Sequence, residues 1–223
     1  RMNDFFMDKA TPSANIFAGD PNEYESSETT HYSVIDKDGN AVSVTTTINL
    51  GYGSGILVEG AGFFLNNEMD DFSVKAGVPN YFGLVGNDAN AIEPRKRPLS
   101  SMTPTIVLKD NEPLIILGSP GGSRIITTVL QTILNVTVHN MSIQEAVSAP
   151  RVHSQWLPEV IMVEPFSVNK DVRKLLKRKG HKISPYVIYS GTEMIGEMNA
   201  ILINESGYFG GADTRGENTA IGY

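Results

Sequence analysis

Short stretches in which apolar and polar residues alternate predict a series of β-hairpins. Residues 30–36 and 41–48 form the first two such stretches, and the pair Asp38-Gly39 lies between them. An Asp-Gly pair in this position is typical of a tight hairpin turn. The same reasoning predicts a second hairpin from residues 105–109 and 114–117 around Asp110-Asn111, and a last one from 200–204 and 208–209 around Ser206-Gly207.

Longer apolar patterns between these hairpins predict helices. Residues 124–138 are apolar enough for a helix, although Ile125 and Ile126 are β-branched and weaken that preference. Ser142 and Glu145 form a capping box that opens a second helix. A third, amphipathic helix is predicted over 169–179, with Gly180 closing it. Strands, then helices, then strands indicate an α+β domain built in layers.

Three segments lack a regular pattern. Residues 1–28 contain Pro12, Gly19 and Pro21 and are predicted to be a tail or linker. Residues 50–62 carry five glycines and are predicted to be a flexible loop. Residues 73–98 form a long polar connection, and a connection of that length is usually functional or mobile.

Composition narrows the class of protein. The chain has 223 residues, 40% of them hydrophobic, which suits one large globular domain or two small ones. The net charge of -7 argues against nucleic acid as a partner, because phosphates require a basic surface. The absence of cysteine excludes disulfides, a thiol nucleophile and thiolate metal ligands. No apolar run reaches the roughly 18 residues that a membrane span needs.

Two adjacent threonines, Thr29 and Thr30, precede the first predicted hairpin. A threonine hydroxyl is a weak nucleophile unless a base stands beside it, and the α-amine of an N-terminal threonine is such a base. Because 28 residues precede Thr29, this chemistry requires a cut between Glu28 and Thr29. The hairpin would return Thr47 beside Thr29, where its hydroxyl could hold the nucleophile. The structural alternative is a pair of ordinary strand threonines.

The glycine-rich segment 118–124 follows a predicted strand and precedes a predicted helix. It is either a plain strand-to-helix turn or an anion site. In the second case the backbone N–H groups at the helix start point at developing negative charge. A phosphate-binding loop is disfavoured, because the segment lacks the Gly-Lys-Ser/Thr ending of that motif.

Polar clusters elsewhere leave several interpretations open. Glu68, Asp70 and Asp71 are either a solvated loop, a calcium site without the EF-hand spacing, or a binding position for a substrate ammonium. Ser100 and Ser101 are either loop residues or donors to a substrate carboxylate. The histidines lack zinc-helix spacing and are interpreted as structural or surface residues: His31, His139, His153 and His181. Seven basic residues over 170–182 are interpreted as a solvated face.

Several longer strings together resemble the γ-glutamyltranspeptidase family. They are TTHYSVIDKDGNAVSVTTTIN from Thr29, LNNEMDDFS, GLVGNDANAI, KRPLSSMTPTIV, GSPGGSRIITTVLQ and APRVHSQWLP, and they cover the chain densely to about Pro158. The resemblance implies an N-terminal-nucleophile hydrolase with an αββα sandwich, partial here without the large subunit. It implies that residues 1–28 end the large subunit, that self-cleavage separates Glu28 from Thr29, and that residues 29–223 are the small, catalytic subunit.

The resemblance also implies roles for single residues. Thr29 would be the nucleophile and Thr47 the threonine that positions it, while Gly121 and Gly122 would form the oxyanion hole. The substrate α-amine would be held by Asn49, Glu68 and Asp71, and its α-carboxylate would lie near Ser100 and Ser101. An arginine of the large subunit would clamp that carboxylate.

The implied reaction takes a γ-glutamyl group from glutathione or a related donor to water, an amino acid or a peptide. It implies no metal or organic cofactor, a large-subunit partner, and a periplasmic or secreted location. Two other interpretations remain open: a different acylase or amidohydrolase of the same architecture, such as a capsule-processing relative, and an inactive, uncleaved precursor fragment.

Overall fold

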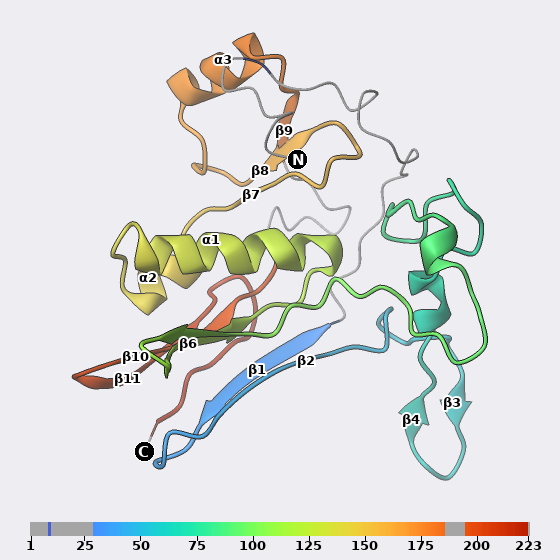
Figure 1. Ribbon diagram of the computed structural model, residues 1–223, viewed down its shortest axis with the longest axis horizontal. Helices are drawn as coiled ribbons and strands as arrows, with labels where there is room; N and C mark the ends of the chain where they lie inside the picture. Colours follow the sequence, from blue (N-terminus) through green and yellow to red (C-terminus); the bar gives the residue numbers. More distant parts are fainter. Residues whose placement is uncertain (1–8, 10–28, 186–194, 223) are drawn as a thin grey trace. The chain divides into compact units, whose positions relative to one another are not determined.

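The computed structural model describes residue 9 and residues 29–185 and 195–222 (Figure 1). The predicted tail, apart from residue 9, and Glu28 lie outside the described residues. The chain divides into two compact units. Unit 1 comprises Arg1–Glu25, Met69–Leu99 and Pro150–Ile195, and unit 2 comprises Ser26–Glu68, Ser100–Ala149 and Gly196–Tyr223.

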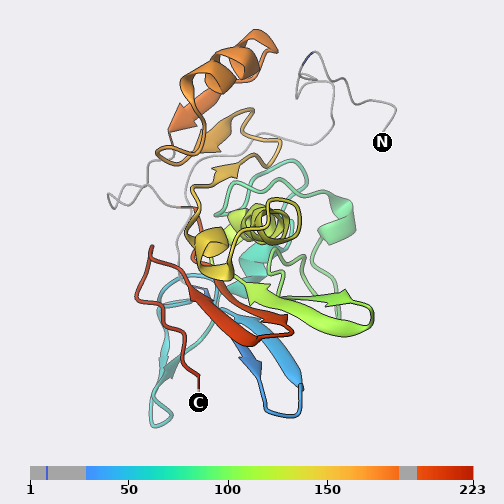
Figure 2. The same ribbon diagram turned by 90° about the vertical axis from the view of Figure 1, so that its left-hand side faces the viewer.

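Unit 2 is built around a four-stranded antiparallel sheet with the strand order β11-β10-β6-β5. Helices α1 and α2 cover one face of this sheet, and the hairpin of β1 and β2 covers the other (Figures 1 and 2). The unit therefore shows an α-β-β layering, which is part of the expected αββα sandwich. The elements are β1 (Thr30–Ile35), β2 (Ala41–Thr46), β5 (Thr105–Lys109), β6 (Glu112–Gly118), α1 (Ile125–Thr137), α2 (Ile143–Ser148), β10 (Asn199–Asn204) and β11 (Gly207–Ala212).

Strand β6 lies in the middle of these layers and is apolar on both faces. Ile115, Ile116 and Leu117 are all fully buried. Ile115 and Leu117 pack with Ile125 and Val129 of α1. Because side chains alternate along a strand, Ile116 faces the opposite layer, the β1–β2 hairpin. A central strand with cover on both faces explains why this run reads as continuously apolar rather than alternating.

The predicted hairpins are confirmed, and their turns follow from local chemistry. Asp36 stabilises the first turn, because its carboxylate accepts hydrogen bonds from the backbone N–H of Asp38 and of Asn40, each at 2.9 Å. The second hairpin is tighter than predicted. Asp110 and Asn111 both adopt positive φ, at 54° and 69°, so that β6 resumes at residue 112 rather than 114. Two such residues in succession are what a two-residue type I′ turn requires.

The three predicted helices are also confirmed. Helix α1 begins at Ile125, after a short 3-10 turn, η5 (Gly122–Arg124). The capping box of α2 is formed as predicted, with the Ser142 backbone N–H donating to the Glu145 carboxylate at 2.9 Å. Helix α3 (Lys170–Arg178) is capped by Asn169, whose side-chain oxygen accepts from the Val172 N–H at 2.9 Å.

The sequence patterns missed several short strands. The glycine-rich segment 50–62, predicted to be a flexible loop, contains the first strand of a small hairpin, in which Leu57 pairs with Phe64. A three-stranded sheet of unit 1, in the order β7-β8-β9, was not predicted either. These strands hold only two or three residues each, too few for a period of two to show. They are β3 (Leu57–Val58), β4 (Phe63–Phe64), β7 (Val152–His153), β8 (Ile161–Val163) and β9 (Ile183–Pro185).

The long polar segment of unit 1 is organised by asparagine side chains rather than by strands. The Asn80 side-chain oxygen accepts from the backbone N–H of Phe82 at 3.0 Å and of Leu84 at 2.9 Å. The Asn90 amide donates to the Asp71 carbonyl at 2.7 Å and accepts from the Leu99 N–H at 2.9 Å. Two short 3-10 turns accompany these contacts, η3 (Glu68–Asp71) and η4 (Asp88–Asn90).

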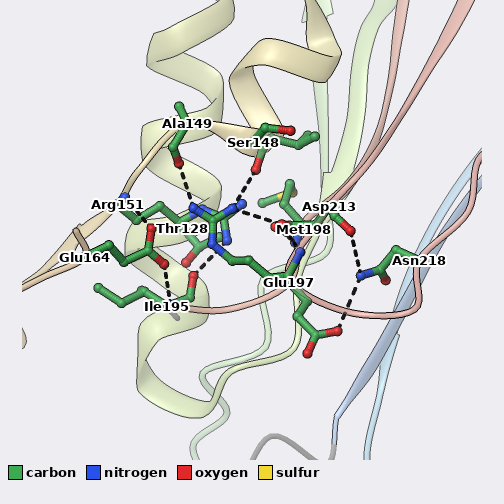
Figure 3. Close-up of polar contacts among 12 residues, drawn as sticks. Thr128, Ser148, Ala149, Arg151, Glu164, Ile195, Glu197, Met198, Asp213 and Asn218 are labelled. Atoms are coloured by element: carbon green, nitrogen blue, oxygen red, sulfur yellow. Dashed lines mark hydrogen bonds and ion pairs between the residues drawn. The ribbon is translucent and has the colours of Figure 1, made fainter. Parts of the chain in front are cut away.

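Buried charges join distant parts of unit 1. The Glu164 carboxylate accepts from the backbone N–H of Arg151 at 2.8 Å and of Ile195 at 2.6 Å, while the Arg151 guanidinium donates to the Ile195 carbonyl (Figure 3).

Among the described residues, no helix combines the length and apolar character required to cross a membrane.

Candidate active site

Thr29 and Thr47 lie at the open end of the β1–β2 hairpin. The last paired residues at this end are Thr30 and Thr46, so that Thr29 directly precedes and Thr47 directly follows the final pair of the ladder. Both residues are half-buried, whereas Thr30 and Thr46 are exposed. The antiparallel register therefore places both threonines at the same end of the ladder, each one residue beyond the final pair.

The Thr47 hydroxyl is oriented by the backbone that follows it. Its oxygen accepts a hydrogen bond from the Asn49 N–H at 2.9 Å. A hydroxyl has one donor and two acceptor positions. This bond uses an acceptor position, so the O–H can still donate a hydrogen bond to another group. Asn49 itself has φ of 76°, a left-handed conformation that asparagine tolerates better than most residues.

Asn49 and the start of η3 are held together by Asn67. The buried Asn49 amide donates to the Asn67 carbonyl, and the Asn67 side-chain oxygen accepts from the Leu50 N–H, each at 3.2 Å. Glu68 follows directly, and its N–H donates to the Asn66 side chain at 3.0 Å. These bonds bring Asn49 and Glu68, which are distant in the sequence, into one small region of unit 2.

The glycine pair forms the turn between β6 and α1. Gly121 has φ of 132° and Gly122 has φ of 56°, and both values strain a residue that carries a side chain. Gly121 is buried, and its carbonyl accepts from the Arg124 N–H at 3.1 Å, which starts the 3-10 turn η5. This is the strand-to-helix turn predicted from the sequence, with glycine backbone at the entrance of a helix.

Two contacts pack the β1–β2 hairpin against the end of β6, the strand that precedes this turn. The His31 imidazole occupies the space beside Gly118, at the end of β6, and the Ser43 hydroxyl donates to the Leu117 carbonyl at 3.0 Å. His31 lies two residues after Thr29, and Gly118 lies three residues before Gly121. The start of β1 and the start of α1 consequently lie at the same end of unit 2 (Figure 1).

The serine pair precedes strand β5 in unit 2. Ser100 is exposed, and its hydroxyl oxygen accepts from the Met102 N–H at 3.2 Å. Ser101 is half-buried. The Ser100 contact is a local turn contact that leaves its O–H available as a donor.

The acidic cluster separates into residues with different surroundings. Asp70 has a structural contact, because its carboxylate accepts from the Tyr81 N–H at 2.9 Å. Asp71 is half-buried, and its carbonyl is held by Asn90. Asp70 and Asp71 belong to unit 1, whereas Glu68 belongs to unit 2.

His31 is a buried structural residue, as predicted. Its two ring nitrogens lie 2.8 Å from the Thr45 hydroxyl and 3.0 Å from the Ser33 hydroxyl. Burial disfavours the charged ring and lowers the pKa of His31 from 6.5 to about 4. Within the described ranges, no group of three acidic or histidine side chains is arranged to hold a metal ion.

Comparison with known proteins identifies the family of this chain. The family model for γ-glutamyltranspeptidase matches residues 3–223. The chain belongs to the γ-glutamyltranspeptidase family. The resemblance seen in the sequence strings is thereby confirmed, and so is the expected α+β fold class.

Individual relatives support the same assignment. A glutathione hydrolase proenzyme from Escherichia coli is 49% identical over 219 residues, which are 97% of this chain and 37% of that protein. An acivicin-inhibited γ-glutamyltranspeptidase, whose C-terminus is described as critical for autoprocessing and catalysis, is 56% identical with a TM-score of 0.77 and covers 84% of this chain and 99% of its own. A γ-glutamyltranspeptidase from Pseudomonas nitroreducens complexed with L-DON is 45% identical with a TM-score of 0.78, over 87% of this chain and 99% of its own. The chain thus spans little more than a third of the length of the E. coli relative.

The sequence reasoning did not single out some residues that organise this site. Asn67 and Ser119 were read only as parts of longer strings, yet each bridges two segments near the candidate residues. Asn67 is half-buried and Ser119 is fully buried. A polar residue directly beside a glycine-rich turn is the signal that could have identified Ser119, since such a side chain bonds backbone groups that a turn leaves without strand partners.

Proposed function

We propose that residues 29–223 are the catalytic small subunit of an enzyme that hydrolyses and transfers γ-glutamyl groups, with glutathione as a donor, and that residues 1–28 end its large subunit. The observation that carries the proposal is the position of Thr29 and Thr47, which both lie directly beyond the last pair of the β1–β2 ladder. This is the end of unit 2 where Gly121 and Gly122 lead into α1 (Figure 1). A nucleophile, a hydroxyl to hold it and glycine amides at a helix start are the parts that acyl transfer requires.

The first proposed reaction is self-cleavage. The Thr29 Oγ attacks the Glu28 carbonyl carbon, the peptide C–N bond breaks, and the acyl group moves from nitrogen to oxygen. Water then hydrolyses the resulting ester, which restores the hydroxyl and leaves a free α-amine on Thr29. Such an amine has an ordinary pKa of about 7.7–8.0, so a substantial fraction is unprotonated and can act as a base near neutral pH.

The second proposed reaction is turnover. The α-amine takes the hydroxyl proton, and Thr29 Oγ attacks the γ-amide carbonyl of the donor. The N–H groups of Gly121 and Gly122 stabilise the oxyanion, and the proton passes to the leaving amine as the amide bond breaks. A γ-glutamyl ester remains on Thr29 until water or the amine of an acceptor amino acid or peptide releases it.

Recognition of the donor would rest on its two charged ends. Asn49, Glu68 and Asp71 are proposed to hold the α-ammonium, and the contacts of Asn67 support the first two by fixing Asn49 beside the start of η3. The hydroxyls of Ser100 and Ser101 are proposed to donate to the α-carboxylate. The large subunit of the same precursor is the proposed partner and would supply the arginine that completes the carboxylate site.

The proposal can be tested with the full precursor that contains this chain. Intact mass spectrometry should show scission between Glu28 and Thr29. The matured protein should cleave γ-glutamyl-p-nitroanilide and should leave an unrelated acyl anilide intact. Comparable rates on both anilides would instead favour a general acylase, and a matured protein that cleaves neither would contradict the proposal.

Thr30 offers a matched control for the nucleophile. Thr29→Ala should abolish both scission and turnover, because it removes the attacking oxygen. Thr30→Ala removes the same group one residue later, from an exposed strand position, and should retain both. A Thr29→Ala precursor that is still cut before residue 29 would contradict the self-cleavage scheme.

A further inference from the structure

Ser119 is a fully buried serine that joins the glycine turn to a distant segment of unit 2. Its oxygen accepts a hydrogen bond from the Glu197 N–H at 2.9 Å, across 78 residues of sequence. Its O–H donates to the carbonyl of the next residue, Pro120. The hydroxyl thus uses its single donor on one side of the turn and an acceptor position on the other.

The bond to Pro120 has a consequence for Gly121. The Pro120 carbonyl and the Gly121 N–H belong to the same peptide unit, which is planar and trans, so the two groups point in opposite directions. A hydroxyl that holds the Pro120 oxygen therefore also fixes the direction of the Gly121 N–H. That N–H is one of the two groups proposed to stabilise the oxyanion.

Close packing restricts this peptide unit further. A Cβ added to Gly121 would lie 3.1 Å from the Cα of Gly196. A Cβ added to Gly196 would lie 2.7 Å from the Ser119 hydroxyl oxygen and 2.9 Å from that of Thr128. Two glycine backbones and the serine hydroxyl therefore occupy one tightly filled space, which limits rotation of the turn.

The Glu197 segment is itself held in place. The Met198 N–H donates to the buried Asp213 carboxylate at 2.7 Å, and Asn218 donates to the Asp213 carbonyl at 3.2 Å and to the Glu197 side chain at 3.4 Å (Figure 3). The backbone that donates to Ser119 is consequently anchored on its far side. A rigid support on one side of a hydroxyl and a glycine turn on the other is the arrangement expected of a positioning contact.

We infer that Ser119 is a positioning residue, which aims the Gly121 N–H at the oxyanion through the Pro120 carbonyl. The inference rests on the proposed function. Loss of an oxyanion donor commonly lowers kcat about 10²–10³-fold. Because Ser119→Ala leaves the donor present but less well aimed, we expect kcat on γ-glutamyl-p-nitroanilide to fall about 10-fold to 100-fold, with KM changed less than about 3-fold.

Ser43 provides the matched control. Its hydroxyl also donates to a carbonyl near the end of β6, that of Leu117 at 3.0 Å, but this peptide unit does not contain Gly121. Ser43→Ala should therefore keep the parent kcat. It should lower the melting temperature less than Ser119→Ala does, because Ser43 is half-buried and loses one hydrogen bond, whereas Ser119 is fully buried and loses two. Values of kcat should be expressed per site labelled by an electrophilic glutamine analogue, so that incomplete maturation does not lower them.

Ser119→Cys keeps a weak donor and acceptor at the same position and should retain an intermediate kcat. If Ser119→Ala does not fold or mature, the kcat of Ser119→Cys tests the inference in its place. The inference is overturned if the kcat of the folded Ser119 variants equals that of Ser43→Ala, or if only KM changes. A parent protein without turnover of γ-glutamyl donors would instead overturn the proposed function.

Discussion

His31 occupies the space that a side chain at position 118 would need. A Cβ built on Gly118 would overlap the imidazole ring, and the ring is confined by the Thr45 and Ser33 hydroxyls at 2.8 Å and 3.0 Å. This contact joins the hairpin that carries Thr29 to the strand that leads into the glycine turn. It explains why glycine ends β6.

Gly118→Ala should therefore destabilise the fold. The added methyl group must displace a buried ring that has two hydrogen bonds, and overpacking of this kind costs about 1–3 kcal/mol. The free energy of unfolding, measured by urea titration, should fall by that amount. Gly222→Ala is a suitable control, because a Cβ there meets open space. Equal stability of the two variants would show that the His31 ring moves aside at little cost.

The same histidine predicts a dependence of stability on pH. Burial lowers the pKa of His31 to about 4, whereas the unfolded chain titrates near 6.5. Between these values the unfolded state binds the proton and the folded state does not, so stability falls as the pH drops from 6.5 to 4. At about 1.4 kcal/mol per pH unit, the full loss amounts to about 3 kcal/mol. Above pH 6.5 this residue contributes no slope.

The test compares the parent protein with His31→Gln by urea unfolding at several values between pH 4.5 and 7.5. Substitution of a buried residue changes the stability at every pH, so the informative quantity is the slope. We expect the parent protein to show the steeper decline below pH 6.5. Parallel curves would mean that His31 becomes protonated in the folded state at its ordinary pKa.

Most of the fold of unit 2 could be predicted from the sequence, because the information is local. The Asp38-Gly39 turn, the Ser142–Glu145 capping box and the apolar run of β6 each determine an element within a few residues. The short strands of unit 1 could not be predicted. A strand such as β7, with only Val152 and His153, shows no periodicity, and its pairing depends on residues distant in the sequence.

Less of the candidate site than of the fold of unit 2 could be predicted from the sequence. The hairpin register follows from the turn, and it places Thr29 and Thr47 directly beyond the last pair of the ladder, Thr30 and Thr46. The contacts of Asn67 and Ser119 join segments up to 78 residues apart, and a pattern that repeats over two or four residues carries no information about them. Asp70 and Asp71 are neighbours of the same charge, and no sequence pattern shows that the Asp70 carboxylate accepts from the Tyr81 N–H whereas the Asp71 carbonyl accepts from Asn90.

A prediction for Thr47 follows from its contact with Asn49. The Thr47 hydroxyl oxygen accepts from the Asn49 N–H at 2.9 Å. In the proposed role, its O–H would donate to Thr29. Thr47→Val preserves the shape without the hydroxyl and should lower kcat on γ-glutamyl-p-nitroanilide about 10-fold or more, since misplacing a reacting group by about 1 Å can cost about 10²-fold. Thr47→Ser should retain most activity, and Thr46→Val, at an exposed neighbouring position, should be silent. Full activity of Thr47→Val would remove this residue from the site.

Asp71 and Asp70 should respond differently to the same substitution. Asp71→Ala removes a carboxylate proposed to bind the substrate ammonium, so KM for the γ-glutamyl donor should rise at least about 10-fold, which corresponds to about 1.4 kcal/mol of lost binding. Asp70→Ala instead removes the acceptor of the Tyr81 N–H, and it should lower the free energy of unfolding by about 1 kcal/mol with little change in KM. Steady-state kinetics and urea unfolding of both variants separate these effects. Asp70→Ala could raise KM as much as Asp71→Ala does. In that case both carboxylates affect substrate binding, directly or through the conformation of residues 68–71, and the assignment of substrate binding to Asp71 alone is wrong.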